Sequence, residues 1–164
     1  MFPPDLLDIA TRLLAECRAR HLKLATAESC TGGLIAGLLT EIAGSSDVVE
    51  RGFVTYSNEA KSELVGVPPE LIARVGAVSE EVARAMAEGA VARAKVDLAV
   101  AVTGIAGPGG ATPGKPVGLV HFACARAGRP MLHERHEFGE IGRGPVRLTS
   151  VALALDLLAR QART

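Results

Sequence analysis

The chain has 164 residues, 48% of them hydrophobic, which suits one compact domain with a substantial core. Its 18 basic and 18 acidic residues give a formal net charge of +0, and only 3% of the residues are aromatic. A neutral chain leaves no electrostatic footprint for nucleic acid, and few aromatic rings argue against a base-stacking surface. The expected partner is therefore a small molecule or a protein.

The cysteines indicate a reducing compartment. Cys17, Cys30 and Cys124 are an odd number without a C-x-x-C pair, which predicts neither a disulfide framework nor a structural zinc site. The amino-terminal residues carry acids where a signal peptide needs a basic flank, and no apolar run reaches the roughly 18 residues of a membrane span. We expect a cytoplasmic protein with no membrane association.

The first elements alternate between helix and strand. Apolar residues at helical spacing predict an amphipathic helix over residues 5–20, with Asp5 as its N-cap. A short strand is expected over 22–27. A second helix follows, which we expect Thr31 to cap and Gly44 to end.

The middle of the chain continues this alternation. Residues 51–58 are β-branched and aromatic in an alternating pattern, which predicts a strand, and residues 59–76 hold one or two short helices broken at prolines. Ser79 is predicted to cap a long helix that reaches about Ala94. The run from Leu98 to Val102 is apolar throughout, as expected for a central strand covered on both faces.

After a loop rich in glycine and proline, residues 117–127 and 131–138 predict an antiparallel hairpin, with the more polar second strand at an edge. A helix from about Pro145 to Arg160 closes the chain. This order of elements predicts an α/β fold, a three-layer α/β/α sandwich with a mixed sheet, formed as one domain over residues 1–164.

Three of the predicted strands end in polar residues that run into a helix start or a glycine-rich turn. In open α/β sheets the carboxyl ends of the strands line the crevice that binds ligands. If these strands are parallel neighbours, the following polar side chains converge: Ser29, Thr31, Tyr56, Asn58, Lys61 and Thr103. Backbone N–H groups of Gly32, Gly33 and the 104–110 loop would add donors for an anion.

The stretch "ESCTGG" offers three hydroxyl or thiol groups. Ser29 is either a turn residue or a nucleophile exposed on a tight strand-to-helix turn, although neither a G-x-S-x-G elbow nor a nearby His–Asp pair accompanies it. Cys30 is either a small buried hydrophobe or a thiolate stabilised at a helix start. Thr31, as an N-cap, could still contact a ligand.

A serine nucleophile needs a base, and the sequence offers few. Lys61 is either a solvated helix lysine or, if buried with a lowered pKa, that base. Tyr56, the only tyrosine, is either a half-buried strand aromatic or part of the site. His21 falls in a turn, and the other three histidines fall on the late strands, away from the polar strand ends.

Two further patterns carry less information. The loop "GIAGPGG" matches neither the Walker A sequence nor the dinucleotide fingerprint, so its composition allows phosphate binding without specifying it. His133 and His136 would point to opposite faces of a strand and could not readily share a metal ion. No metal site is predicted.

Several motifs together resemble one known family: "TAESCTGG", "ERGFVTYSNEAK", "GAVSEEVA", "VTGIAGPGG" and "KPVG". The chain is similar to the nicotinamide-nucleotide amidase family, also known as the carboxy-terminal domain of the competence-damage-inducible protein CinA. The resemblance spans about residues 5–160 and points to a stand-alone form. It implies hydrolysis of the carboxamide of nicotinamide mononucleotide in pyridine nucleotide salvage, an α/β/α fold, a homodimer or higher oligomer, and no metal or other cofactor.

The resemblance also implies roles for individual residues. The family's serine nucleophile falls on Ser29 and its lysine base on Lys61, with Tyr56 beside them. Its substrate pocket falls on the following residues: Cys30, Thr31, Gly32, Gly33, Asn58, Thr103, Gly104, Gly107, Arg143 and Arg147. The glycine loop and one or both arginines would hold the 5′-phosphate. One departure is that "EIGRGPVR" lacks an aspartate common in the family before the last helix.

Two other functions remain open from the residues alone. A phosphate-binding loop without chemistry would make the chain a nucleotide-binding or interaction domain. Alternatively, Cys30 could serve as the nucleophile of an amidase that acts on another small carboxamide.

Overall fold

The computed structural model describes all residues, 1–164. Its centre is a five-stranded sheet in the order β2-β1-β3-β4-β5. The strands are β1 (Leu24–Glu28), β2 (Val49–Val54), β3 (Leu98–Gly104), β4 (Leu119–Arg126) and β5 (Leu132–Glu137). β1 pairs in parallel with β2 and β3, whereas β4 is antiparallel to both β3 and β5. The predicted mixed sheet and its closing hairpin are therefore confirmed.

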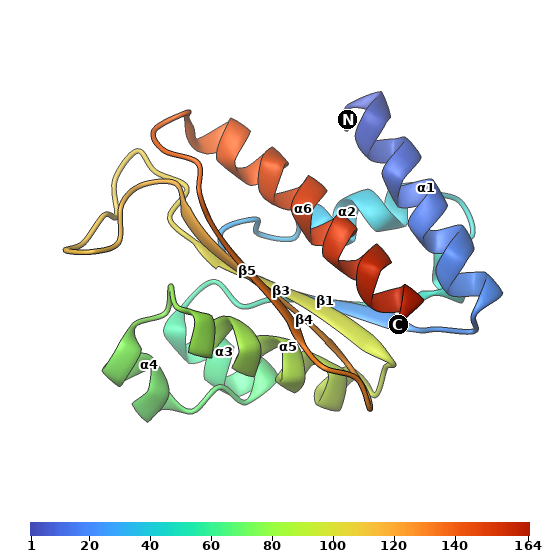
Figure 1. The fold of residues 1–164 in the computed structure, drawn as a ribbon, viewed down its shortest axis with the longest axis horizontal. Helices are drawn as coiled ribbons and strands as arrows, with labels where there is room; N and C mark the ends of the chain where they lie inside the picture. Colours follow the sequence, from blue (N-terminus) through green and yellow to red (C-terminus); the bar gives the residue numbers. More distant parts are fainter.

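Helices cover both faces of the sheet (Figure 1). One face carries α1 (Pro4–Ala19), α2 (Leu34–Glu41) and α6 (Arg143–Arg163), and the other carries α3 (Asn58–Val65), α4 (Pro69–Val75) and α5 (Glu80–Ala94). A short 3-10 turn, Ser45–Asp47, leads into β2. This is the predicted three-layer sandwich. No helix combines the length and the apolar character that crossing a bilayer requires.

The central strand β3 divides the core into two layers. Leu98, Val100 and Val102 face the α1, α2 and α6 side, while Ala99 and Ala101 face α5. All five side chains are fully buried, which explains why the sequence is apolar throughout this strand. The small alanines let α5 lie close to the sheet.

Helix ends account for most differences from the sequence-based boundaries. Pro3, not Asp5, is the N-cap of α1, and Pro4 occupies the first helical position, where a missing N–H costs no helical hydrogen bond. Helix α2 ends at Glu41, before Gly44, and α6 extends to Arg163. Ser79 caps α5 as predicted, since its Oγ accepts a hydrogen bond from the N–H of a residue in the first turn.

Candidate active site

Polar residues converge where β1, β2 and β3 end. The three strands are parallel, so their carboxyl ends lie at one edge of the sheet. Ser29 follows β1 directly, and its N–H donates to the carbonyl of Val102 at 2.9 Å. Thr55 follows β2, and its N–H donates to the carbonyl of Glu28 at 2.9 Å. The backbone ladder thus continues past the strand ends and fixes the position of Ser29.

Ser29 lies within hydrogen-bond distance of Lys61 on helix α3, which packs over this edge of the sheet. Helix α3 begins after Ser57, whose Oγ accepts a hydrogen bond from the N–H of Ala60 at 3.0 Å. Its first turns place Lys61 over the sheet, with Nζ 3.2 Å from Ser29 Oγ. Both side chains are buried, with 9% of Ser29 and 1% of Lys61 exposed. Two residues predicted separately as nucleophile and base are therefore within hydrogen-bond distance.

The surroundings of Lys61 favour a neutral amine. Its Nζ lies 2.8 Å from the carbonyl oxygen of Thr55 and 3.4 Å from those of Tyr56 and Ser57, and no carboxylate forms an ion pair with it. Burial lowers the pKa of Lys61 below its ordinary value. If the carbonyls accept its N–H groups, the lone pair faces Ser29, as a general base requires.

The turn after Ser29 differs from the prediction at Thr31. The N-cap of α2 is Gly33, in the left-handed region at φ 96°, and the fully buried Oγ1 of Thr31 has no hydrogen-bond partner. Glu28 supplies the cap instead. Its carboxylate accepts the N–H groups of Gly33, Ile35 and Ala36 at 2.9–3.1 Å. The sequence analysis missed Glu28, and an acid shortly before a helix start was the available signal.

Two backbone N–H groups of this turn have no oxygen acceptor. Gly32 donates to the carbonyl of Ser29 at 3.0 Å, and the N–H of Gly33 is held by Glu28. The N–H groups of Cys30 and Thr31 form no such bond. Of the four amides from Cys30 to Gly33, only these two remain available to a developing oxyanion. Gly32 and Gly33, the donors predicted from the sequence, are engaged within the turn.

A third amide comes from the end of β3. The N–H of Ile105 donates to the carbonyl of Leu119 on β4 at 2.9 Å. Since successive N–H groups along a strand point to opposite sides, the N–H of Gly104 points toward β1, beyond whose end Ser29 lies. Among the backbone bonds outside the helices and strands, the Gly104 N–H makes none.

Thr103 lies beside Ser29 in the parallel register of β1 and β3, and its Oγ1 donates to the carbonyl of Ala77 at 2.9 Å. His121 lies directly opposite Thr103 on β4. The prediction that this histidine lies away from the polar strand ends is wrong, because antiparallel β4 starts at the edge where β3 ends. Burial lowers the pKa of His121 to about 4, so the imidazole is neutral near pH 7, and its Nδ1 lies 3.1 Å from Nε2 of His133.

Tyr56 and Arg143 join two loops that flank the site. Arg143, at the start of α6, donates from Nη2 to Tyr56 Oη at 3.2 Å and from Nη1 to the carbonyl of Gly107 at 3.0 Å. Tyr56 is 61% exposed, so it is neither a core nor a half-buried aromatic. The bridge connects the β2–α3 loop with the glycine-rich loop after β3.

Arg147, one turn along α6, has a different environment. Its Nε and Nη2 donate to the carbonyls of Cys30 and Thr31, both at 3.0 Å. The guanidinium thus binds the backbone of the turn that follows Ser29.

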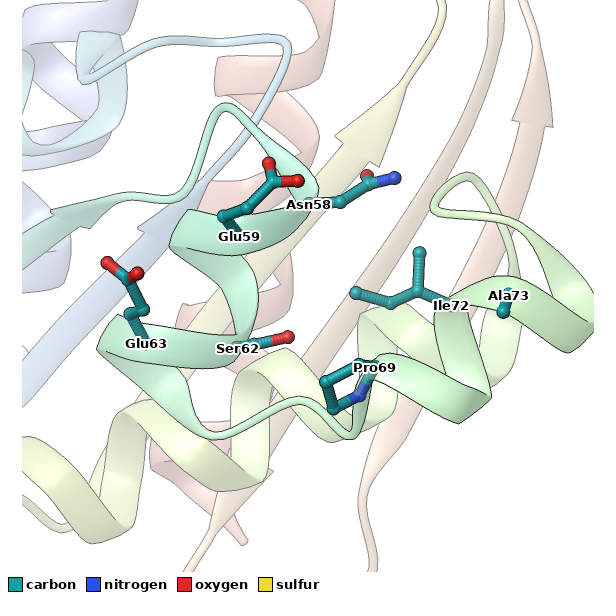
Figure 2. Close-up of a pocket in the computed structure, with 7 residues that line it drawn as sticks. All are labelled: Asn58, Glu59, Ser62, Glu63, Pro69, Ile72 and Ala73. Atoms are coloured by element: carbon teal, nitrogen blue, oxygen red, sulfur yellow. The ribbon is translucent and has the colours of Figure 1, made fainter.

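Asn58 lines a cavity of about 420 Å³ between α3 and α4 (Figure 2). The other lining residues are Glu59, Ser62, Glu63, Pro69, Ile72 and Ala73. Figure 2 shows Ile72 projecting from α4 toward α3, between the two walls of this cavity. Ser29 and Lys61 do not line this cavity.

The thiol next to Ser29 is buried and protonated. Cys30 is 6% exposed, and burial raises its pKa to about 11. Near pH 7 it is therefore a neutral thiol rather than a thiolate.

No group of three or more His, Cys, Asp or Glu side chains is arranged to hold a metal ion. The polar groups of the site are instead a serine, a lysine, free amides and arginines, which suit nucleophilic attack on a carbonyl and binding of an anion.

The chain is similar to known proteins over most of its length. The model of the CinA C-terminal domain matches residues 7–162. A nicotinamide-nucleotide amidohydrolase, PncC, of Escherichia coli is 46% identical over 161 residues, which are 98% of this chain and 97% of that protein. A competence-damage inducible protein of Symbiobacterium thermophilum is 63% identical over 118 residues, 72% of this chain, but only 27% of its own length is matched.

Among solved structures, the competence/damage inducible protein CihA of Agrobacterium tumefaciens superposes with a TM-score of 0.96 at 50% sequence identity. The superposition covers 100% of this chain and 99% of that one. Family model, full-length relative and fold agree: the chain belongs to the family of CinA C-terminal domains.

Proposed function

We propose that the protein hydrolyses the carboxamide of nicotinamide mononucleotide to nicotinate mononucleotide and ammonia, a step of pyridine nucleotide salvage. The observation that carries this proposal is the buried contact between Ser29 and Lys61, with Nζ 3.2 Å from Oγ. The similarity to the Escherichia coli protein named nicotinamide-nucleotide amidohydrolase, over nearly both whole chains, supports the substrate.

In the first step, neutral Lys61 takes the hydroxyl proton of Ser29, and Oγ attacks the carboxamide carbon. The carbonyl oxygen gains negative charge as the tetrahedral intermediate forms. The N–H groups of Cys30 and Thr31, which have no oxygen acceptor, and the N–H group of Gly104 are the candidate donors to this oxyanion. A single such donor typically contributes about 2.7–4 kcal/mol to catalysis.

In the second step, the Lys61 ammonium gives its proton to the nitrogen of the substrate. The C–N bond breaks, ammonia leaves, and the nicotinoyl group remains as an ester on Ser29. Lys61, neutral again, removes a proton from water, which attacks the ester carbon. Oγ leaves, recovers the proton from Lys61, and nicotinate mononucleotide is released.

Arg143 is the group best suited to the 5′-phosphate. Its guanidinium lies at the glycine-rich loop, already bonded to the carbonyl of Gly107, and a planar fork of donors can bind two phosphate oxygens. Thr103, beside the nucleophile, is proposed to contact the carboxamide or the pyridine ring. Tyr56 would hold the arginine at this position through its hydroxyl.

The cysteine alternative has little physical support. A thiol with a pKa of about 11 is almost entirely protonated near pH 7, and Lys61 Nζ bonds to Ser29 rather than to Cys30. The alternative of a nucleotide-binding domain without chemistry leaves a buried lysine without a role, although burying an amine without a carboxylate partner is costly.

Ammonia release separates these functions. The pure protein would be incubated with nicotinamide mononucleotide, with and without EDTA, as wild type, Ser29→Ala, Cys30→Ala and Lys61→Ala. We expect loss of activity in the serine and lysine variants and near wild-type rates in Cys30→Ala and in EDTA. Loss confined to Cys30→Ala would overturn the serine mechanism, and no ammonia from wild type would favour a binding domain. Loss in EDTA would indicate a metal requirement.

A further inference from the structure

Glu28 is a buried carboxylate without a cationic partner. Only 1% of it is exposed, and it forms no salt bridge. Both of its oxygens are nevertheless saturated: Oε1 accepts from Thr26 Oγ1 at 3.1 Å and from Ala36 N–H at 2.9 Å, while Oε2 accepts from the N–H groups of Gly33 and Ile35 at 3.1 and 3.0 Å. The positive end of the α2 dipole offsets its charge.

The position of Glu28 in the strand gives this network a mechanical consequence. Successive side chains along β1 point to opposite faces, so Glu28 faces α2 while Ser29 faces α3 and Lys61. The carboxylate therefore lies on the side of the strand opposite Ser29 and links the strand end to Gly33 through a hydrogen bond. The chain between these two residues becomes a short closed turn.

Arg147 holds the same turn from α6. It donates to the carbonyls of Cys30 and Thr31. A trans peptide unit is planar, with its N–H pointing opposite to its carbonyl. Fixing the Cys30 carbonyl toward α6 therefore directs the Thr31 N–H, one of the free amides, away from α6.

We infer that Glu28 and Arg147 together form a clamp that positions the nucleophile turn for catalysis. Neither side chain touches the reacting atoms. Together they fix the direction of Ser29 Oγ and of the Thr31 N–H before the substrate arrives. The inference rests on the proposed function, and it assigns Arg147 to the turn rather than to the phosphate.

Kinetics of conservative variants test the clamp. Glu28→Gln keeps the shape but turns an acceptor oxygen into an NH₂ group that faces N–H donors, and Arg147→Lys keeps the charge but loses the fork. A displacement of about 1 Å in a reacting group can lower a rate about a hundredfold. We expect kcat for ammonia release from nicotinamide mononucleotide to fall at least about tenfold in each variant, with KM changed less than about twofold.

Two matched controls lie at the other end of the sheet. Asp97 accepts the N–H of Lys23 at 2.7 Å, and Arg126 donates to the carbonyls of Gln161 and Ala162, both at 2.9 Å. Asp97→Asn and Arg126→Lys therefore make the same chemical changes at carboxylate–backbone and arginine–backbone contacts that are remote from Ser29. We expect them to lower the melting temperature while keeping kcat within about twofold of wild type.

A milder pair covers the case in which Glu28→Gln does not fold. Thr26→Val removes one of the four donors to the carboxylate, and Thr26→Ser restores it. We expect a fall in kcat for the valine variant and recovery for the serine variant, which a loss of packing alone would not produce.

Three results would overturn the clamp. The first is that Glu28→Gln and Arg147→Lys lower only the melting temperature, as their controls do. The second is that Arg147→Lys raises KM alone, which would return Arg147 to substrate binding. The third is that Thr26→Ser fails to recover kcat. Failure of the proposed function is seen separately, as full activity in Ser29→Ala or no activity in wild type.

Discussion

Lys61 Nζ lies 3.2 Å from Ser29 Oγ, although the two residues are 32 positions apart in the chain. The contact joins the end of β1 to the second turn of α3. Burying an amine without a carboxylate partner destabilises a fold, so its presence beside a serine at the ligand-binding edge of the sheet is better explained by chemistry than by packing.

The activity should rise with pH as Lys61 loses its proton. Because burial lowers the pKa of Lys61, the midpoint of kcat/KM for nicotinamide mononucleotide should lie below 10.5, the ordinary value. His121, with a pKa of about 4, cannot produce a limb above about pH 6. A midpoint at or above 10.5 would contradict a base whose pKa is lowered by burial.

The pKa of Lys61 should also affect how the free energy of unfolding depends on pH. Its pKa is lower in the folded than in the unfolded protein, so the unfolded state binds more protons between the two values and wild-type stability rises with pH there. Lys61→Met removes the titrating amine and, with it, this pH-dependent contribution to stability. We expect the stability of wild type relative to Lys61→Met to increase as the pH approaches 10.5, measured by urea unfolding. A difference that is independent of pH would mean that Lys61 is charged in the folded protein.

Arg143 should discriminate between substrates with and without a phosphate. Losing a hydrogen bond to a charged group costs about 1.5–3 kcal/mol, so Arg143→Gln should raise KM for nicotinamide mononucleotide at least about tenfold. With nicotinamide riboside, which lacks the phosphate, wild type and variant should have similar KM values. Equal losses with both substrates would show that Arg143 acts on another part of the site.

Gly89 should tolerate no side chain. A Cβ at this position in α5 would lie 1.7 Å from the carbonyl oxygen of Val65, at the end of α3. Gly89→Ala gains about 1 kcal/mol in helix propensity, but the clash forces the helices apart. We expect a net loss of at least about 2 kcal/mol in the free energy of unfolding.

Gly37→Ala is the matched control for that substitution. Gly37 lies inside α2, and a Cβ there would meet only Phe2 Cζ at 3.7 Å, an ordinary van der Waals contact. The variant should be more stable than wild type by about 0.5–1 kcal/mol. If both variants were stabilised to the same extent, the close approach of α3 and α5 would be refuted.

Much of the fold could be predicted because the local signals agree with one another. The apolar run of β3 and the Ser79 cap of α5 each specify one element without reference to the rest of the chain. The convergence of Ser29 with Thr103 also followed, since it requires only that two strands be parallel neighbours.

The parts that could not be predicted depend on contacts between distant segments. Glu28 caps α2 from the preceding strand, so the capping pattern near Thr31 was misleading. His121 lies at the site edge only because β4 runs antiparallel to β3. The residues of one strand do not determine the direction of its neighbour. Asn58 follows the same strand end as Tyr56 and also lines the cavity between α3 and α4, which depends on how two helices pack (Figure 2).

The central claim is that Ser29 carries the acyl group during turnover. The most direct measurement is to mix wild type with nicotinamide mononucleotide, quench in acid within milliseconds, and locate any added mass by peptide fragmentation. We expect a nicotinoyl-nucleotide ester on Ser29 that is absent from Ser29→Ala. An adduct on Cys30 that persists in Ser29→Ala would contradict it.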